Sequence, residues 1–109
     1  EEVDFSFRAK QIGWLSVYFA GAQAFHVGGG TSQQVKAKRL FYSRRSRIQY
    51  VFKHFNTMKI ILVLLVTLLI EPVARIILFI GKKSLTSIKE TLIAYTMLYK
   101  WVFFRIKNK

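Results

Sequence analysis

The sequence predicts an α/β fragment at its start, followed by basic and hydrophobic helices that associate with a membrane. Three observations lead to this prediction. Strand-forming residues cluster at 14–19 and 24–27. The 109 residues include 18 Lys and Arg against 5 Asp and Glu, a net charge of +13, yet 52% are hydrophobic. An apolar run fills 60–70 and is broken only by Thr67. Disordered basic tails are far less apolar, whereas a basic chain at a membrane combines both properties.

Residues 1–34 form the α/β part of this prediction. Apolar side chains recur at helical steps over 3–12, and Gly13 is well placed to end that helix in a left-handed conformation. Residues 14–19 and then 24–27 predict two short strands. The three glycines within 28–32 predict a loop, whose last serine is able to cap a following helix.

Residues 35–57 predict a basic amphipathic helix. Between Lys36 and Lys59 the chain has eight cations and no acid. Arginines 44, 45 and 47 are expected on or near the side opposite an apolar stripe. Such a helix is typical of a membrane surface, but a helix packed on its own domain with a solvated basic face explains this segment equally well. The stripe consists of Leu40, Phe41, Ile48, Val51, Phe52 and Phe55.

Residues 58–80 are 23 residues long, enough for a membrane span of about 20. Glu71 and Arg75 are spaced to pair on one helix face, and Pro72 predicts a kink. Two geometries remain: a kinked span whose charged pair faces protein, or two helices in the interface that break at 71–72. Both flanks are basic, so a single span would place one basic cluster on the non-cytoplasmic side, against the positive-inside tendency. A re-entrant or interfacial segment is therefore favoured. A buried core helix is a weaker alternative, since little chain remains to cover it.

The last part of the chain, within 58–109, predicts a helical tail anchored at a membrane interface. Ser87 and Glu90 fit a capping box, which predicts that a helix begins there. Aromatic residues beside Lys and Arg are typical of an interfacial anchor. They are Tyr95, Tyr99, Trp101, Phe103 and Phe104, followed by Arg105, Lys107 and Lys109.

Two groups near the start of the chain have the chemistry of a site. His26 precedes a glycine loop at 28–32, and a glycine loop that opens a helix can present backbone N–H groups to phosphate. The spacing fits neither a P-loop nor a dinucleotide fingerprint. Asp4 and Arg8 are spaced to form a simple helix pair. The other group is a set of acids that complement a helix dipole: Glu1, Glu2 and Asp4.

In this order, the motifs resemble the C-terminal part of family 2 glycosyltransferases with the GT-A fold, in particular the bacterial rhamnosyltransferase-like branch. The resemblance is carried by EEVDFSFRA at 1–9, Gly13-Trp14 and HVGGGTS at 26–32. Residues 42–47 and 53–55 also resemble the basic helix that follows in that branch. The similarity covers about the first half of the chain residue by residue, and the second half only in character.

The resemblance implies roles for these residues in an inverting sugar transfer. Glu2 would be the catalytic base within the acidic motif that also contains Glu1 and Asp4. Arg8 would contact phosphate or orient the acids. His26 would help to bind either a divalent metal, Mg²⁺ or Mn²⁺, or the nucleotide diphosphate in the complete enzyme. The remaining implied substrate- and diphosphate-binding residues are Trp14, Gly28, Gly29, Gly30, Thr31 and Ser32.

The family's nucleotide-binding half and its Asp-x-Asp metal motif lie upstream of this acidic motif. The sequence has a single Asp and no Asp-x-Asp, so we expect a fragment that has no transferase activity on its own.

The expected function is that of the C-terminal fragment of a membrane-associated glycosyltransferase of cell-surface polysaccharide synthesis. Its donor would be a nucleotide sugar, with rhamnose as a candidate sugar. Its acceptor would be a saccharide or a polyprenyl-diphosphate-linked saccharide, and its place the cytoplasmic face of the bacterial inner membrane, as a peripheral, monotopic or single-pass protein. The alternative is a non-enzymatic basic module that binds anionic lipid. Nucleic-acid binding is disfavoured, because the apolar run at 60–70 adds nothing to a groove binder.

Overall fold

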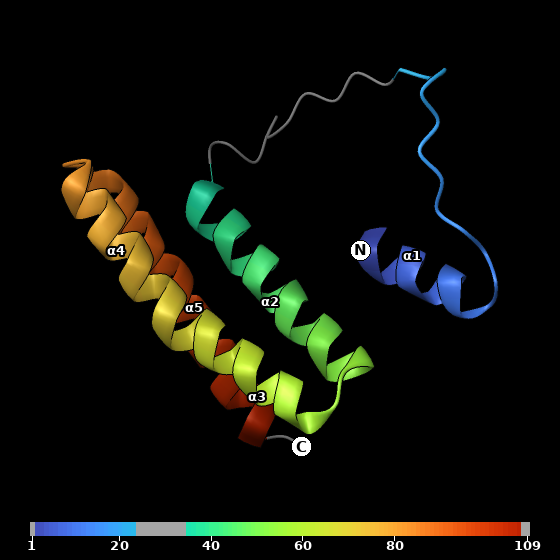
Figure 1. The fold of residues 1–109 in the computed structure, drawn as a ribbon. Coiled ribbons are helices and arrows are strands. Elements are labelled where there is room, and N and C mark those ends of the chain that lie inside the picture. The colour runs from blue at the N-terminus through green and yellow to red at the C-terminus, as the bar shows by residue number, and fades with distance from the viewer. Residues whose placement is uncertain (1, 24–34, 108–109) are drawn as a thin grey trace. The chain divides into compact units, whose positions relative to one another are not determined.

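The computed structural model describes residues 2–23 and 35–107, and the chain divides into two units, Glu1–Gly30 and Thr31–Lys109. Figure 1 shows that the regular structure in the described ranges is helical. No strand occurs in these ranges. The predicted α/β class is therefore wrong, and the fold is all-helical where it is described.

The first unit contains one helix, α1 (Glu2–Gln11), as predicted. Gly13 follows it with a φ of +90°, a conformation that L side chains rarely adopt. The N–H of Trp14 donates to the Ala9 carbonyl at 3.0 Å, and that of Gly13 to the Lys10 carbonyl at 3.1 Å. These two bonds form a Schellman motif, which confirms the predicted left-handed helix end at Gly13.

The predicted strand at 14–19 is not formed. These residues have no regular structure, and the side chains of Leu15, Val17 and Tyr18 are 80%, 81% and 91% exposed. A strand needs a neighbour to pair its N–H and C=O groups, and the described residues provide none, so β propensity alone does not suffice. The second predicted strand, 24–27, lies outside the described residues.

The second unit begins with α2 (Lys36–His54), which confirms the basic helix predicted within 35–57. Phe55 is extended and ends α2. Asn56 then caps the next helix, because its side chain accepts a hydrogen bond from the N–H of Lys59 at 3.3 Å. This turn brings the following helix back alongside α2 (Figure 1).

The apolar segment forms a continuous helix, Thr57–Gly81, built from α3 (Thr57–Leu65), the π-helical turn η2 (Val66–Ile70) and α4 (Glu71–Gly81). Pro72 therefore does not break the helix in two, as the interfacial geometry had assumed. In a regular helix the N–H of residue 72 would donate to the carbonyl of Leu68. Instead, the Tyr99 hydroxyl donates to that carbonyl at 2.5 Å, and the preceding π turn accommodates the proline ring.

A tight turn joins α4 to α5 (Leu85–Lys107). It is a second Schellman motif, in which the N–H of Ser84 donates to the Phe79 carbonyl at 3.0 Å and Lys83 adopts a φ of +50°. The helix begins two residues earlier than the predicted capping box, so Ser87 lies in its first turn. The Ser87 hydroxyl accepts a hydrogen bond from Ser84 at 2.8 Å rather than capping the helix.

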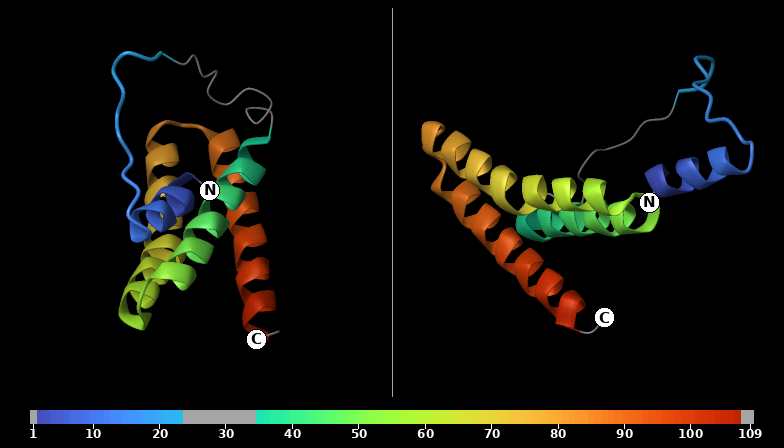
Figure 2. Two further views of the ribbon diagram at one scale, coloured as in Figure 1. Left: turned by 90° about the vertical axis from the view of Figure 1, so that its right-hand side faces the viewer. Right: turned by 60° about the horizontal axis from the view of Figure 1, so that its bottom comes forward.

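The core of the second unit lies where α2 and α5 meet. Helix α2 also packs on α3, and α4 packs on α5, as Figure 2 shows. The apolar stripe of α2 is thus covered by its own unit at Phe41, Ile48 and Val51, whereas Phe52 and Phe55 at its C-terminal end are 39% and 37% exposed. The buried apolar side chains are Phe41, Ile48 and Val51 from α2 and Ala94, Tyr95 and Leu98 from α5.

Candidate functional site

The described site residues from the sequence lie in the first unit. Asp4 and Arg8 form an ion pair across one turn of α1, with Arg8 Nε 3.1 Å from Asp4 Oδ2. Glu2 is exposed in the first turn of α1, and Trp14 is 70% exposed just after it. The pairing of Asp4 with Arg8 matches the simple helix pair that their spacing predicts.

The remaining predicted site residues lie outside the described residues: Glu1, His26, Gly28, Gly29, Gly30, Thr31 and Ser32. In residues 2–23 and 35–107, no group of three or more His, Asp or Glu side chains gathers in a way that could hold a metal ion. A role for Mg²⁺ or Mn²⁺ therefore depends on the resemblance alone.

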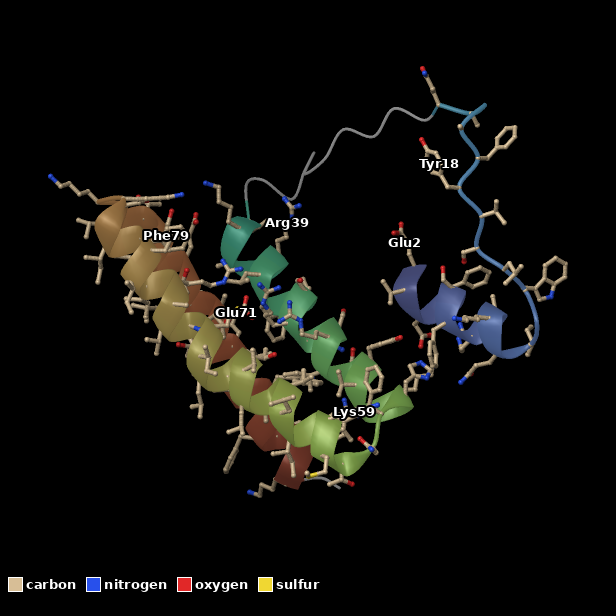
Figure 3. All side chains as sticks on the ribbon, viewed as in Figure 1. Glu2, Tyr18, Arg39, Lys59, Glu71 and Phe79 are labelled. Carbon is tan, nitrogen blue, oxygen red and sulfur yellow. The ribbon has the colours of Figure 1, made fainter. Side chains whose placement is uncertain are left out.

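A charged cluster that the sequence predicts only in part lies in the second unit. Glu71 and Arg75 pair as their spacing predicts, with Arg75 Nε 3.1 Å from Glu71 Oε1. Arg47 of α2 donates to Glu71 Oε2 at 3.1 Å, and Arg44 of α2 donates to Oε1. Figure 3 shows Glu71 between α2 and α4. We call these four residues the Glu71 cluster.

The Glu71 cluster forms because α2 turns part of its basic sequence inward. Arg44 follows Phe41 by three residues and precedes Ile48 by four, so all three lie on one helix face. The side chain of Arg44 is only 12% exposed, and that of Glu71 is 17% exposed. The expectation that Arg44 lies on the side opposite the apolar stripe is therefore wrong. The acid Glu71 within an apolar helix is the feature of the sequence that indicates this contact, because a buried carboxylate needs a cationic partner.

Polar groups without partners lie on the buried faces of these helices. Thr67 and Tyr95 are 0% and 3% exposed, and their hydroxyl groups have no hydrogen-bond partner among the described residues. The same holds for the Nε atoms of Arg44 and Arg45. Burial raises the pKa of the Tyr95 hydroxyl above its usual value, so Tyr95 is neutral at physiological pH.

Cations also stack on aromatic rings where α2 meets the end of α5. The guanidinium of Arg45 lies 5.6 Å from the centre of the Trp101 ring, and that of Arg105 lies 5.4 Å from the same ring. Arg105 is also 5.2 Å from the centre of the Phe52 ring. These contacts connect the two helices and hold basic groups beside aromatic ones.

The helix Thr57–Gly81 leaves most of its apolar surface uncovered. It is long and apolar enough to span a membrane, and only 11% of its most apolar window is buried. The exposed side chains continue along its whole length. They include Met58, Ile61, Leu62, Leu65, Leu69, Ile70, Val73, Ile77, Leu78 and Ile80.

Comparison with known proteins adds no relative: no family model, curated protein or solved structure matches this chain. The candidate functional surfaces are therefore the α1 acids, the Glu71 cluster and the exposed apolar face of Thr57–Gly81.

Proposed function

We propose that α2–α5 attach the chain to a membrane surface, with the exposed side of Thr57–Gly81 in contact with acyl chains. The carrying observation is that this face is continuous, apolar and uncovered, whereas soluble monomers rarely expose large apolar patches. The charge of +13 adds attraction to anionic lipid. Together, these two properties are those of an interfacial protein.

The position of the Glu71 cluster favours an interfacial helix over a spanning one. Glu71 lies 71 − 57 = 14 residues from one end of the helix and 81 − 71 = 10 from the other, about 21 Å and 15 Å along its axis. A span would therefore carry this carboxylate and its guanidinium partners close to the bilayer centre, where charges are costly. In an interfacial helix the same groups remain at the level of the headgroups.

Single cysteines distinguish the two geometries, because the chain has no native cysteine. Thr57→Cys and Lys82→Cys place a thiol near each end of the apolar helix, at exposed positions. With the protein on sealed vesicles, a membrane-impermeant maleimide should label both from the outside. Labelling of one end only would show that the helix spans. Ile77→Cys, in the exposed apolar face, is the control and should be protected until detergent is added.

The attached activity in this proposal is an inverting glycosyl transfer, supported by the resemblance of residues 1–9, 13–14 and 26–32. Glu2 takes the proton of an acceptor hydroxyl as that oxygen bonds to the sugar and the nucleotide diphosphate of the donor leaves. A divalent cation, when bound, stabilises the charge of that diphosphate. The acceptor is a saccharide or a lipid-linked saccharide at the cytoplasmic face of the bacterial inner membrane.

The test of this activity uses the complete enzyme with its upstream half. Glu2→Gln should abolish turnover while donor binding is retained, since the amide cannot accept the proton. Glu90→Gln removes a carboxylate from α5, outside the acidic motif, and should leave turnover unchanged. Turnover that survives in Glu2→Gln would reject Glu2 as the base.

The alternative is a non-enzymatic anchoring module. It is favoured by the ion pair between Asp4 and Arg8, because these two implied site residues bind each other in the structure. The upstream sequence separates the two proposals most directly. An Asp-x-Asp motif preceded by a strand-rich half supports the enzyme. Its absence, together with vesicle binding and no sugar transfer, supports the module.

A further inference from the structure

We infer that the Glu71 cluster, beyond joining α2 to α4, is a binding site for a phosphate group at the membrane surface. The inference rests on the proposed membrane attachment, because attachment places the cluster beside lipid headgroups, which carry phosphate. The chemistry recognised is that of phosphate oxygens held by guanidinium groups.

The first argument is an excess of positive charge. Three guanidinium groups surround the single carboxylate of Glu71, which leaves the cluster at 3 − 1 = +2. In residues 2–23 and 35–107, no second acid contacts Arg44, Arg47 or Arg75. Excess charge in a partly buried site favours the uptake of an anion from outside the protein.

The second argument is the number of unused donors. A guanidinium carries five N–H donors, yet Arg47 and Arg75 each contact Glu71 through a single nitrogen. The buried Nε of Arg44 has no hydrogen-bond partner among the described residues. Arg44 Nη1 donates to Ser43 Oγ at 3.0 Å, and the remaining donors of the cluster, mainly those of Arg47 and Arg75, are left for another acceptor.

The third argument is access. Arg44 is nearly buried, but the side chains of Arg47 and Arg75 are 43% and 30% exposed. An anion can thus reach these two from solvent while Arg44 and Glu71 hold the site in place. Phosphate suits this geometry because several oxygens on one centre can accept from two guanidinium groups at once.

The test compares variants of α2 on vesicles that contain phosphatidic acid. Arg39→Gln removes an exposed cation that is not part of the cluster and should weaken binding about fivefold, the effect of one surface charge. Arg47→Gln removes the same charge from the cluster and should weaken binding roughly tenfold further. Equal losses in the two variants would overturn the site.

Glu71→Gln provides a test of opposite sign. Without its carboxylate the cluster has no internal anion, so its affinity for phosphate should rise if the site exists. Removal of any acid raises the attraction of the chain to anionic lipid, so Glu90→Gln, which removes an acid outside the cluster, sets the baseline. A gain in Glu71→Gln no larger than the gain in Glu90→Gln would count against the inference. Circular dichroism checks that each variant keeps its helices, and Arg47→Gln decides the matter if Glu71→Gln unfolds.

Two further arms identify the phosphate source and separate this inference from the attachment itself. Inorganic pyrophosphate added to the micelle-bound chain should raise its Tm, and more so in Glu71→Gln, if soluble phosphate enters the site. No effect of pyrophosphate, together with the variant pattern on phosphatidic acid, assigns the site to lipid headgroups. Vesicles of phosphatidylcholine alone test attachment: failure to bind them rejects the proposed function, whereas the comparison of Arg39→Gln with Arg47→Gln on phosphatidic acid decides the phosphate site.

Discussion

At the scale of single residues, two helix ends share one backbone geometry but differ in side chain. Gly13 ends α1 and Lys83 ends α4, both at positive φ within a Schellman motif. Glycine adopts this conformation freely, whereas a residue with a Cβ pays about 1–2 kcal/mol. Lys83 is therefore a strained position at the turn between α4 and α5.

Replacement of Lys83 by glycine should stabilise the second unit. We expect Lys83→Gly to raise the free energy of unfolding by about 1 kcal/mol, since relief of the strain exceeds the added freedom of the unfolded chain. Urea unfolding followed by circular dichroism measures the change. Lys83→Ala removes the same charge but keeps the strain and should give little gain. If both variants stabilise equally, charge rather than backbone geometry is the cause.

The hydroxyl of Tyr99 takes the place of the N–H that Pro72 lacks, because it donates to the carbonyl of Leu68. We expect Tyr99→Phe to lower the free energy of unfolding by about 0.5–1 kcal/mol. In a Pro72→Ala background the alanine N–H restores a donor, so the same change should cost less. Tyr95→Phe removes a hydroxyl without a hydrogen-bond partner in the described part of the chain and should be neutral or stabilising. Equal costs of Tyr99→Phe in both backgrounds would refute the compensation.

At the scale of elements, periodicity predicted the helices well. The basic helix was expected within 35–57 and is found at Lys36–His54, and the apolar segment 58–80 is found at Thr57–Gly81. The favoured expectation that the apolar segment breaks into two helices at 71–72 was wrong, because the π turn at Val66–Ile70 accommodates Pro72 within one helix. The strand at 14–19 was wrong because β propensity acts only where a neighbouring strand is present.

The candidate site was less predictable than the helices. The Glu71–Arg75 pair follows from spacing along one helix, but its junction with α2 depends on how two helices pack. The pattern of apolar and polar residues along α2 predicts that its arginines lie opposite the apolar stripe. This is wrong for Arg44, which lies on the buried side because Glu71 matches its charge. A single acid in an apolar helix beside a basic one is the signal that could have indicated this contact.

Substitutions on the two sides of the helical unit should have different effects. Ile77 is 64% exposed and Leu98 is 1% exposed. We expect Ile77→Ser to weaken vesicle binding by about tenfold with little change in stability, because it removes acyl-chain contact. Leu98→Ala should cost about 2–4 kcal/mol of stability, because it leaves a cavity between α2 and α5. Vesicle flotation and urea unfolding measure the two effects. Strong destabilisation by Ile77→Ser would mean that this face packs on protein.

At the scale of the whole molecule, the +13 charge and the 52% of hydrophobic residues are found on different surfaces. Part of the charge is used internally, at the Glu71 cluster and where Arg45 and Arg105 stack on Trp101. The rest remains available to anionic lipid, beside an apolar face that the second unit does not cover. Attachment should thus have one contribution that depends on salt and one that does not.

Salt should separate these two contributions. Ionic strength screens exposed charges, so affinity for anionic vesicles should fall with added salt and level off at the affinity for phosphatidylcholine vesicles. Binding to phosphatidylcholine should persist at high salt, because burial of apolar surface is not screened. Co-sedimentation over a salt series measures both curves. Arg39→Gln should reduce only the salt-dependent fall in affinity for anionic vesicles. Ile77→Ser should lower the affinity for both kinds of vesicle by a similar factor at every salt concentration. Complete release from phosphatidylcholine by salt would show that the apolar face of Thr57–Gly81 does not contact the bilayer.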